Sequence, residues 1–137
     1  MRLKAMLLCL LLVLVGATAR AEDTDLSSNL FEPELILRQQ EALGLSDEQK
    51  NYIKVETRRT QTALTELQWK LEDGVEKLSA QLKAEQINEP AIIAQLDKVL
   101  GLEQEIKRTQ MTLLIRLKNK LTAEQQARLR ELKVKGR

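Results

Sequence analysis

The sequence contains no histidine and a single cysteine, Cys9, which lies in the N-terminal segment that we expect to be removed. Histidine and reduced cysteine are the usual protein ligands of first-row transition metals, so only carboxylates and Met111 remain as candidate ligands. The chain also lacks a thiol nucleophile, an imidazole base and a glycine-rich phosphate loop. We therefore expect no catalytic residues, no enzyme activity, no cofactor and no specific metal site.

Aromatic residues, glycine and proline are scarce as well. The 137 residues include one Trp, one Tyr, one Phe, five glycines and two prolines. Residues that favour strands are thus few, whereas Leu, Glu, Gln, Lys and Arg, which favour helices, are abundant. This composition predicts an all-α fold in a single domain.

The N-terminus has the pattern of a secretory signal peptide. A short basic start, Met1–Lys4, precedes an apolar run, Ala5–Val15, and small residues, Gly16–Ala21. The apolar run is shorter than the ~20 residues of a membrane-spanning helix, which favours cleavage over an uncleaved anchor. We favour cleavage after Ala21 over cleavage after Ala19. The sequence thus predicts a signal peptide at residues 1–21 and an exported protein with no stable membrane insertion after cleavage.

Charge is unevenly distributed along the remaining chain. Residues 22–105 carry 18 acidic and nine basic residues, whereas residues 106–137 carry two acidic and ten basic residues. Such a division suits antiparallel self-docking or a polyanionic partner, and it is also typical of an ordinary solvated face. Export and the lack of interleaved aromatic residues argue against a nucleic-acid partner.

Caps and breakers divide the chain into four expected helices. Residues 22–31 lack periodicity and are predicted to form a flexible leader, residues 32–134 the helical domain, and residues 135–137 a frayed tail. The helices are expected to run from Pro33 to Gly44, from Ser46 to about Glu85, from after Asn88 to about Lys120, and from Thr122 to about Lys133.

The two long helices are expected to form an antiparallel hairpin, because the link at Ile87–Pro90 is short. The third helix has a four-three repeat that predicts its packing row, including the polar residues Glu103 and Gln110. The members of this row are Ile92, Leu96, Val99, Glu103, Ile106, Gln110, Leu113 and Leu117. An elongated hairpin exposes apolar surface, so we expect a homodimer in which long helices pack against those of a second copy.

One phrase occurs twice, as "LSDEQ" from Leu45 and as "LTAEQ" from Leu121. Each copy places Ser or Thr three residues before Gln, which is the capping-box pattern at the start of a helix. The predicted boxes pair Ser46 with Gln49 and Thr122 with Gln125, and the preceding leucines are expected to pack inward.

These motifs, within "LGLSDEQKNYI" and "LTAEQQARLREL", resemble the two LTxxQ motifs of the Spy/CpxP-like periplasmic superfamily, which includes heavy-metal sensors and zinc-resistance-associated proteins. Ser46 replaces the usual Thr in the first copy. The resemblance covers roughly residues 32–134 and implies a curved, antiparallel, four-helix dimer in the periplasm. It also implies an ATP-independent chaperone for unfolded proteins, or a modulator of envelope-stress signalling whose partners include envelope proteins and a sensor kinase.

Client binding by a chaperone requires a surface that is both apolar and charged. We interpret eight residues as candidates for this surface: Arg58, Arg59, Trp69, Lys107, Arg108, Arg116, Lys118 and Lys120. The alternative for the basic members is ordinary surface charge. Trp69 is either an exposed contact or a core anchor, and we expect the core.

The sequence therefore predicts a non-enzymatic, exported protein-binding factor. The alternative function is a heavy-metal resistance or sensor-type protein without histidine ligands. Family sensors for nickel and cobalt carry a histidine four residues before a methionine on the third helix, where this chain has Lys107 before Met111.

Overall fold

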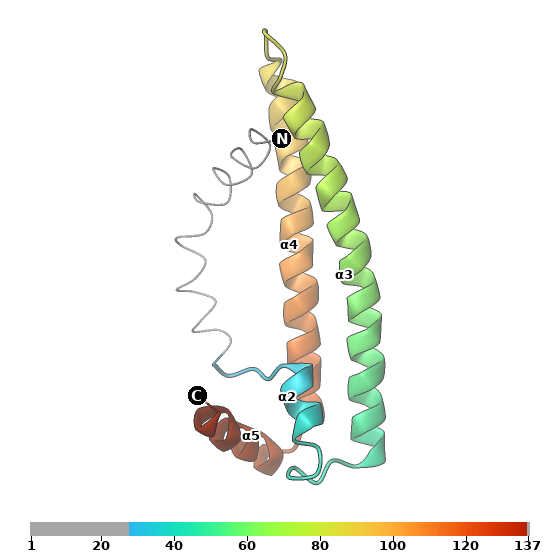
Figure 1. Ribbon diagram of the computed structural model, residues 1–137, viewed down its shortest axis with the longest axis vertical. Coiled ribbons are helices and arrows are strands. Elements are labelled where there is room, and N and C mark those ends of the chain that lie inside the picture. The colour runs from blue at the N-terminus through green and yellow to red at the C-terminus, as the bar shows by residue number, and fades with distance from the viewer. Residues whose placement is uncertain (1–27, 137) are drawn as a thin grey trace.

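The computed structural model describes residues 28–136 and confirms the all-α prediction within that range. It contains four helices (Figure 1): α2 (Pro33–Arg38), α3 (Asp47–Gln81), α4 (Glu89–Lys120) and α5 (Ala123–Lys135). The predicted signal peptide and residues 22–27 of the predicted leader lie outside the described residues. None of the described helices is long and apolar enough to cross a membrane.

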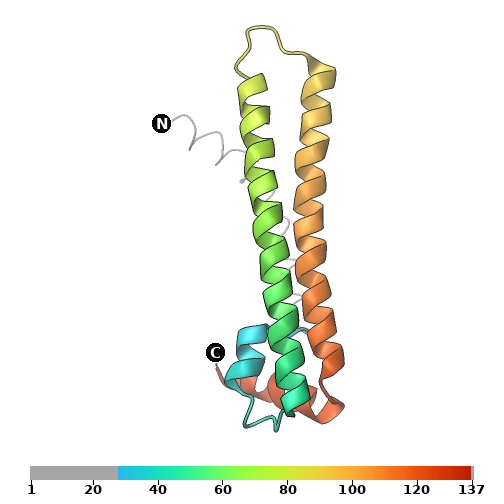
Figure 2. The same ribbon diagram turned by 90° about the vertical axis from the view of Figure 1, so that its right-hand side faces the viewer.

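Helices α3 and α4 lie side by side in antiparallel orientation and form most of the molecule (Figure 2). The 35 residues of α3 correspond to a length of about 52 Å at the ordinary helical rise. At the hairpin tip, the side chain of Asn88 accepts a hydrogen bond from the backbone N–H of Ala91 at 3.1 Å, and Pro90 lies in the first turn of α4. The predicted break between the long helices is thus present, because cap and proline both favour a new helix start there.

The row of α4 residues that packs against α3, called the seam here, differs from the predicted row. Glu103 and Gln110 are exposed, and the residues one position earlier, Leu102 and Thr109, are partly buried instead. One residue corresponds to a rotation of about 100° around a helix, so this difference places the two polar residues outside the interface. The prediction that Glu103 and Gln110 interrupt the seam is wrong.

Gly74 lies against this seam. A Cβ atom at Gly74 would lie 3.4 Å from Val99 Cγ2 and 3.7 Å from Gln95 Nε2, which is ordinary van der Waals contact with α4. Gln95 is buried there, and its Nε2 donates a hydrogen bond to the carbonyl oxygen of Gly74 at 2.9 Å. The seam therefore includes a glycine and a hydrogen-bonded glutamine that an apolar periodicity does not reveal.

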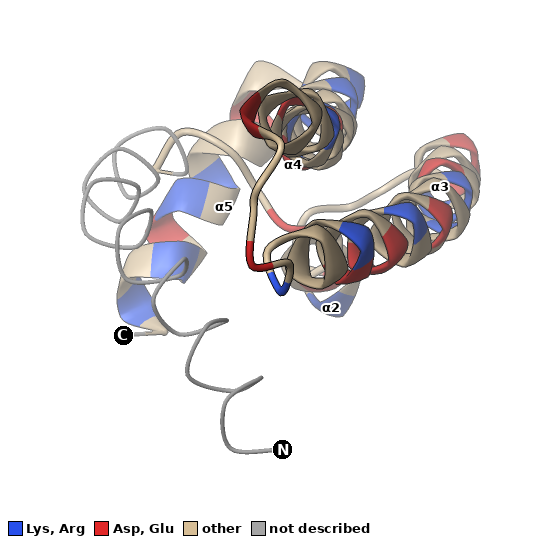
Figure 3. Ribbon diagram, turned by 90° about the horizontal axis from the view of Figure 1, so that it is seen from above, with Lys and Arg blue, Asp and Glu red and all other residues tan. Residues whose placement is uncertain are grey.

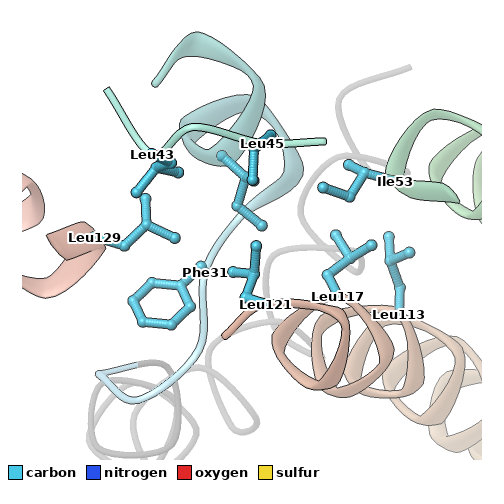
Figure 4. Close-up of a cluster of buried hydrophobic side chains, with 9 residues drawn as sticks. Phe31, Leu43, Leu45, Ile53, Leu113, Leu117, Leu121 and Leu129 are labelled. Atoms are coloured by element: carbon cyan, nitrogen blue, oxygen red, sulfur yellow. The ribbon is translucent and has the colours of Figure 1, made fainter. Parts of the chain in front are cut away.

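The base of the hairpin contains the hydrophobic core (Figure 4). Side chains from all four helices and their connections meet in this cluster: Phe31, Ile36, Leu43, Leu45, Ile53, Leu113, Leu117, Leu121 and Leu129. Both motif leucines, Leu45 and Leu121, are buried as predicted. The long helices thus share one core at their base, while the remaining hairpin is only two helices thick.

Phe31 corrects the predicted extent of the leader. Its side chain is fully buried in the core, although the sequence placed it at the end of a flexible segment. Next to it, Lys133 Nζ on α5 donates a hydrogen bond to the carbonyl oxygen of Leu30 at 3.2 Å. The folded part therefore begins before α2, because the only phenylalanine of the chain fills the core between α2 and α5.

Candidate functional site

Both predicted capping boxes are present at the base. Ser46 Oγ accepts a hydrogen bond from the backbone N–H of Gln49 at 3.1 Å, and Gln49 Oε1 accepts one from the backbone N–H of Ser46 at 3.0 Å. The same two bonds join Thr122 and Gln125 at 3.1 and 3.0 Å. Each box satisfies amide protons that the start of a helix leaves without partners.

The two boxes are also joined to each other through their glutamines, an arrangement called the glutamine clasp here. Gln49 Nε2 donates to Gln125 Oε1 at 2.8 Å, and Gln125 Nε2 donates to Gln49 Oε1 at 3.1 Å. Gln49 Nε2 also donates to the backbone carbonyl oxygen of Lys120 at 2.9 Å, and Gln125 Nε2 also donates to that of Leu43 at 3.3 Å. Each amide therefore uses its two donors and both acceptor positions of its oxygen.

The glutamine clasp gives the two repeated motifs a long-range role in addition to their local role as helix caps. It connects the start of α3 to the start of α5 and to the end of α4. It also connects the start of α5 to the segment between α2 and α3. Glu48 and Lys120 add an ion pair at 2.6 Å beside it, and Lys120 Nζ lies 5.1 Å from the centre of the Tyr52 ring. The hydrogen bond that Lys120 Nζ donates to Glu48 Oε1, together with the positive charge of Lys120, lowers the pKa of Glu48. The motifs thus hold the base of the hairpin together.

Four of the eight predicted client-binding residues are engaged in ion pairs within the chain. Arg116 binds the buried carboxylate of Glu56 at 3.1 Å, across the seam, and Arg59 binds the same carboxylate at 3.4 Å. Lys120 pairs with Glu48, and Arg108 pairs with Glu105 at 3.7 Å. Arg116 and Lys120 therefore have structural roles at the base that the sequence interpretation did not foresee.

The other four residues do not form one surface. Arg58, Lys107 and Lys118 have no ion pair among the described residues, but Arg58 lies on α3 and the two lysines lie on α4. Trp69 is 72% exposed, so the expectation that it is a core anchor is wrong. It lies about half a helical turn around α3 from the buried residues Ile53 and Leu78, because its spacing from both places it on the opposite face.

The structure instead reveals an apolar and basic stripe along one flank of α4, beside the seam. Its residues recur three, four or seven positions apart, so they lie along one side of the helix. This surface, called the α4 flank, consists of Ile93, Leu96, Leu100, Lys107, Met111, Leu114 and Lys118.

The α4 flank is only partly covered by the rest of the chain. Ile93 and Leu100 are each 48% exposed, and the neighbouring Ile115 is 46% exposed. The stripe runs from Ile93 to Lys118, about 37 Å at the helical rise. Its signal in the sequence is a second set of apolar residues that does not fit the seam. The four-three repeat alone does not separate this set, because it places Leu96 in the seam.

No group of three or more His, Cys, Asp or Glu side chains within residues 28–136 is arranged to hold a metal ion. No family model, curated protein or solved structure matches the chain significantly. The resemblance to the Spy/CpxP-like superfamily therefore stays a prediction from the two motifs.

Proposed function

We propose that this protein binds unfolded or partly folded proteins in the periplasm through the α4 flank, as a chaperone-like factor without enzyme activity. The observation that carries the proposal is the exposure of Ile93, Leu100 and Ile115 along a helix that also carries Lys107 and Lys118. Isolated exposed apolar residues are common on protein surfaces, but a row of them with basic residues along one side of a helix, here interrupted by Glu103, is typical of a protein-binding surface.

The chemistry of the α4 flank suits clients without a fixed shape. Leucine, isoleucine and methionine side chains attract apolar segments without strict geometry, and methionine adapts readily to irregular partners. The two lysines add attraction for acidic segments that weakens with salt. Each contact is weak, so affinity arises from many contacts along about 37 Å of helix, a distance that an extended segment of roughly 11 residues can span.

The rigid base supports this use of the hairpin. The core and the glutamine clasp hold α3 and α4 at one end, so the α4 flank keeps its shape without contributing to the main hydrophobic core. A binding surface that is separate from the core tolerates weak, exchanging contacts without loss of the fold.

An aggregation assay tests the proposal. A chemically denatured model enzyme is diluted into buffer with the exported chain at equimolar amount, and light scattering is followed. We expect reduced scattering with the native chain and substantially less protection by the Leu100→Ser variant. Val55→Ser is the matched control, because Val55 is 47% exposed and lies on α3, away from the α4 flank. Equal protection by both variants would place the binding surface elsewhere, and no protection by the native chain would refute the proposal.

The heavy-metal alternative from the sequence stays a prediction as well. Calorimetric titration with zinc, nickel, cobalt and copper tests it directly. Heat of binding at a defined stoichiometry would support it, and a flat titration would remove it.

A further inference from the structure

The two most exposed large hydrophobic side chains of the described residues are Val134, at 74%, and Trp69, at 72%. Trp69 lies in the middle of α3 and Val134 lies near the end of α5. Neither belongs to the core or to the α4 flank. A tryptophan exposed to this degree in a chain with so few aromatic residues is a candidate contact for another molecule.

The surroundings of Trp69 are acidic. Between Glu66 and Lys77 the sequence contains four acidic and two basic residues. The two lysines pair with Glu66 at 2.7 Å and with Asp73 at 2.8 Å, one turn before and after the tryptophan. Glu72 and Glu76, three and seven residues after Trp69, are exposed and have no ion pair among residues 28–136. Trp69, Glu72 and Glu76 form the Trp69 face.

The surroundings of Val134 have the opposite charge. Helix α5 contains four basic and two acidic residues. Arg130, one turn before Val134, and the adjacent Lys135 are exposed, and neither has an ion pair within the described part of the chain. Arg130, Val134 and Lys135 form the Val134 face. Each face thus combines one strongly exposed apolar side chain with two exposed charges that lack partners.

The spacing of the two faces also agrees. Arg130 precedes Val134 by four residues, and Glu72 follows Trp69 by three, so each charge lies about one helical turn, or 5.4 Å, from the apolar side chain. Two antiparallel helices can therefore place Val134 against the indole ring while Arg130 reaches the carboxylate of Glu72. An arginine beside an indole also gains from cation–π attraction.

One chain cannot make this contact with itself. Helix α5 is held at the base, where Gln125 near its start binds Gln49 near the start of α3, and Val134 lies only nine residues, about 14 Å, beyond Gln125 (Figure 1). Trp69 lies 22 residues, about 33 Å, along α3 from Asp47, out of reach of Val134. Figure 3 shows the basic residues of α5 apart from the acidic residues of α3. Both faces are thus exposed in the single chain and available to another molecule.

We propose that a second copy of this chain docks its Val134 face on the Trp69 face of α3. A two-fold pair makes the contact twice, once from each α5. This contact differs from the predicted packing of long helices against each other, because the short helix α5 docks on α3. The proposal is independent of client binding because neither face belongs to the α4 flank.

Trp69 is the only tryptophan of the chain, so its fluorescence reports on its own surroundings without substitution. We expect its emission maximum to shift to shorter wavelength as the protein concentration rises, in parallel with dimer formation in sedimentation equilibrium. Added salt should reverse both changes, because exposed charge pairs are screened. Emission that stays at the position of a solvated indole while dimers form would place the interface elsewhere.

Charge reversal identifies the partners of the contact. Glu72→Arg with Glu76→Arg should weaken self-association about tenfold or more, and Arg130→Glu with Lys135→Glu should do the same. The chain that carries all four changes should regain self-association, because the charges of the two faces then complement each other again. Glu85→Arg with Asp97→Arg is the control, with the same change of charge at exposed positions outside both faces.

Besides unshifted emission, three further results would overturn the proposal. These are a monomer at every concentration reached, association that both reversals leave unchanged, and a fourfold variant as weak as the single-face variants. Helical circular dichroism of each variant confirms folding. The Leu100→Ser variant should associate normally, so failure of self-association and failure of client protection are separately visible.

Discussion

Gln49 and Gln125 donate hydrogen bonds to each other's side-chain oxygens at 2.8 and 3.1 Å, although 76 residues separate them. Each glutamine also completes the capping box of its own helix. Local helix starts and the long-range contact between them thus depend on the same two amide groups. This relationship explains why a short phrase recurs at these two places in the chain.

Substitution of one glutamine tests this dual role. Gln49→Ala should lower the free energy of unfolding by about 1–3 kcal/mol, because it removes a cap, takes one of the two donors from Gln125 Oε1 and removes the donor to the Lys120 carbonyl. Gln49→Glu keeps an oxygen for the cap but provides no N–H donors at neutral pH, so it should be at least as destabilising as alanine. Urea unfolding of both variants measures this, and a Glu variant as stable as the native chain would contradict the clasp.

A double-mutant cycle tests the coupling between the boxes. Gln49→Ala and Gln125→Ala should be non-additive, with a coupling energy of about 1 kcal/mol, because either change already breaks the reciprocal pair. Additive losses would mean that the two caps act independently.

Gly74→Ala should stabilise the hairpin. Alanine has a higher helix propensity than glycine by about 1 kcal/mol, and its Cβ would meet Val99 at an ordinary van der Waals distance of 3.4 Å. Gly74→Val should destabilise it, because the larger side chain would displace Val99 and Gln95. Gly101→Ala is the control for propensity alone, since a Cβ there has no neighbour within 4 Å. The midpoint of thermal unfolding measures all three.

The Glu56–Arg116 ion pair should contribute to stability mainly by satisfying a buried carboxylate. Arg116→Met should lower the free energy of unfolding by about 1–3 kcal/mol, because it leaves Glu56 with only the longer contact to Arg59. Glu56→Met combined with Arg116→Met should recover much of that loss, because no buried charge then remains. A double variant less stable than the single one, in urea unfolding, would contradict this account.

The ion pair between Glu48 and Lys120 should make stability depend on pH in the acidic range. The pKa of Glu48 is lowered from its ordinary value of 4.5 by Lys120, so the contribution is fully present above that value and is lost as the pH falls through the folded-state pKa. Glu48→Gln should therefore be less stable than the native chain at pH 7, with a difference that shrinks as the pH falls below 4.5. Unfolding curves across this range check the sign, and a difference that grows in acid would contradict it.

The sequence predicted those features that depend on local chemistry. Ser46, Asn88 and Thr122 marked the three cap positions correctly. Gly44 adopts the expected left-handed conformation, with φ of 61°, but the predicted helix end there is wrong, because α2 ends at Arg38 and residues 39–44 form turns. These signals act within a few residues, so they are readable without a structure.

Features that depend on the approach of distant segments were not predictable in this way. The burial of Phe31 depends on α5, and the seam depends on the contact of Gly74 with α4. The exposure of Trp69 follows from its angle around α3, which the apolar pattern of the sequence did not resolve. Of the predicted site, Lys107 and Lys118 lie on the α4 flank, whereas Arg116 and Lys120 stabilise the base instead.

Site-specific photo-crosslinking shows whether clients bind at the α4 flank. A photoreactive phenylalanine derivative replaces Leu100 in one variant and Val55 in another, and each is irradiated with an unfolded client protein. We expect strong crosslinks from position 100, weak crosslinks from position 55, and loss of both when the client is folded. Equal crosslinking from the two positions, or crosslinking from position 55 alone, would contradict it.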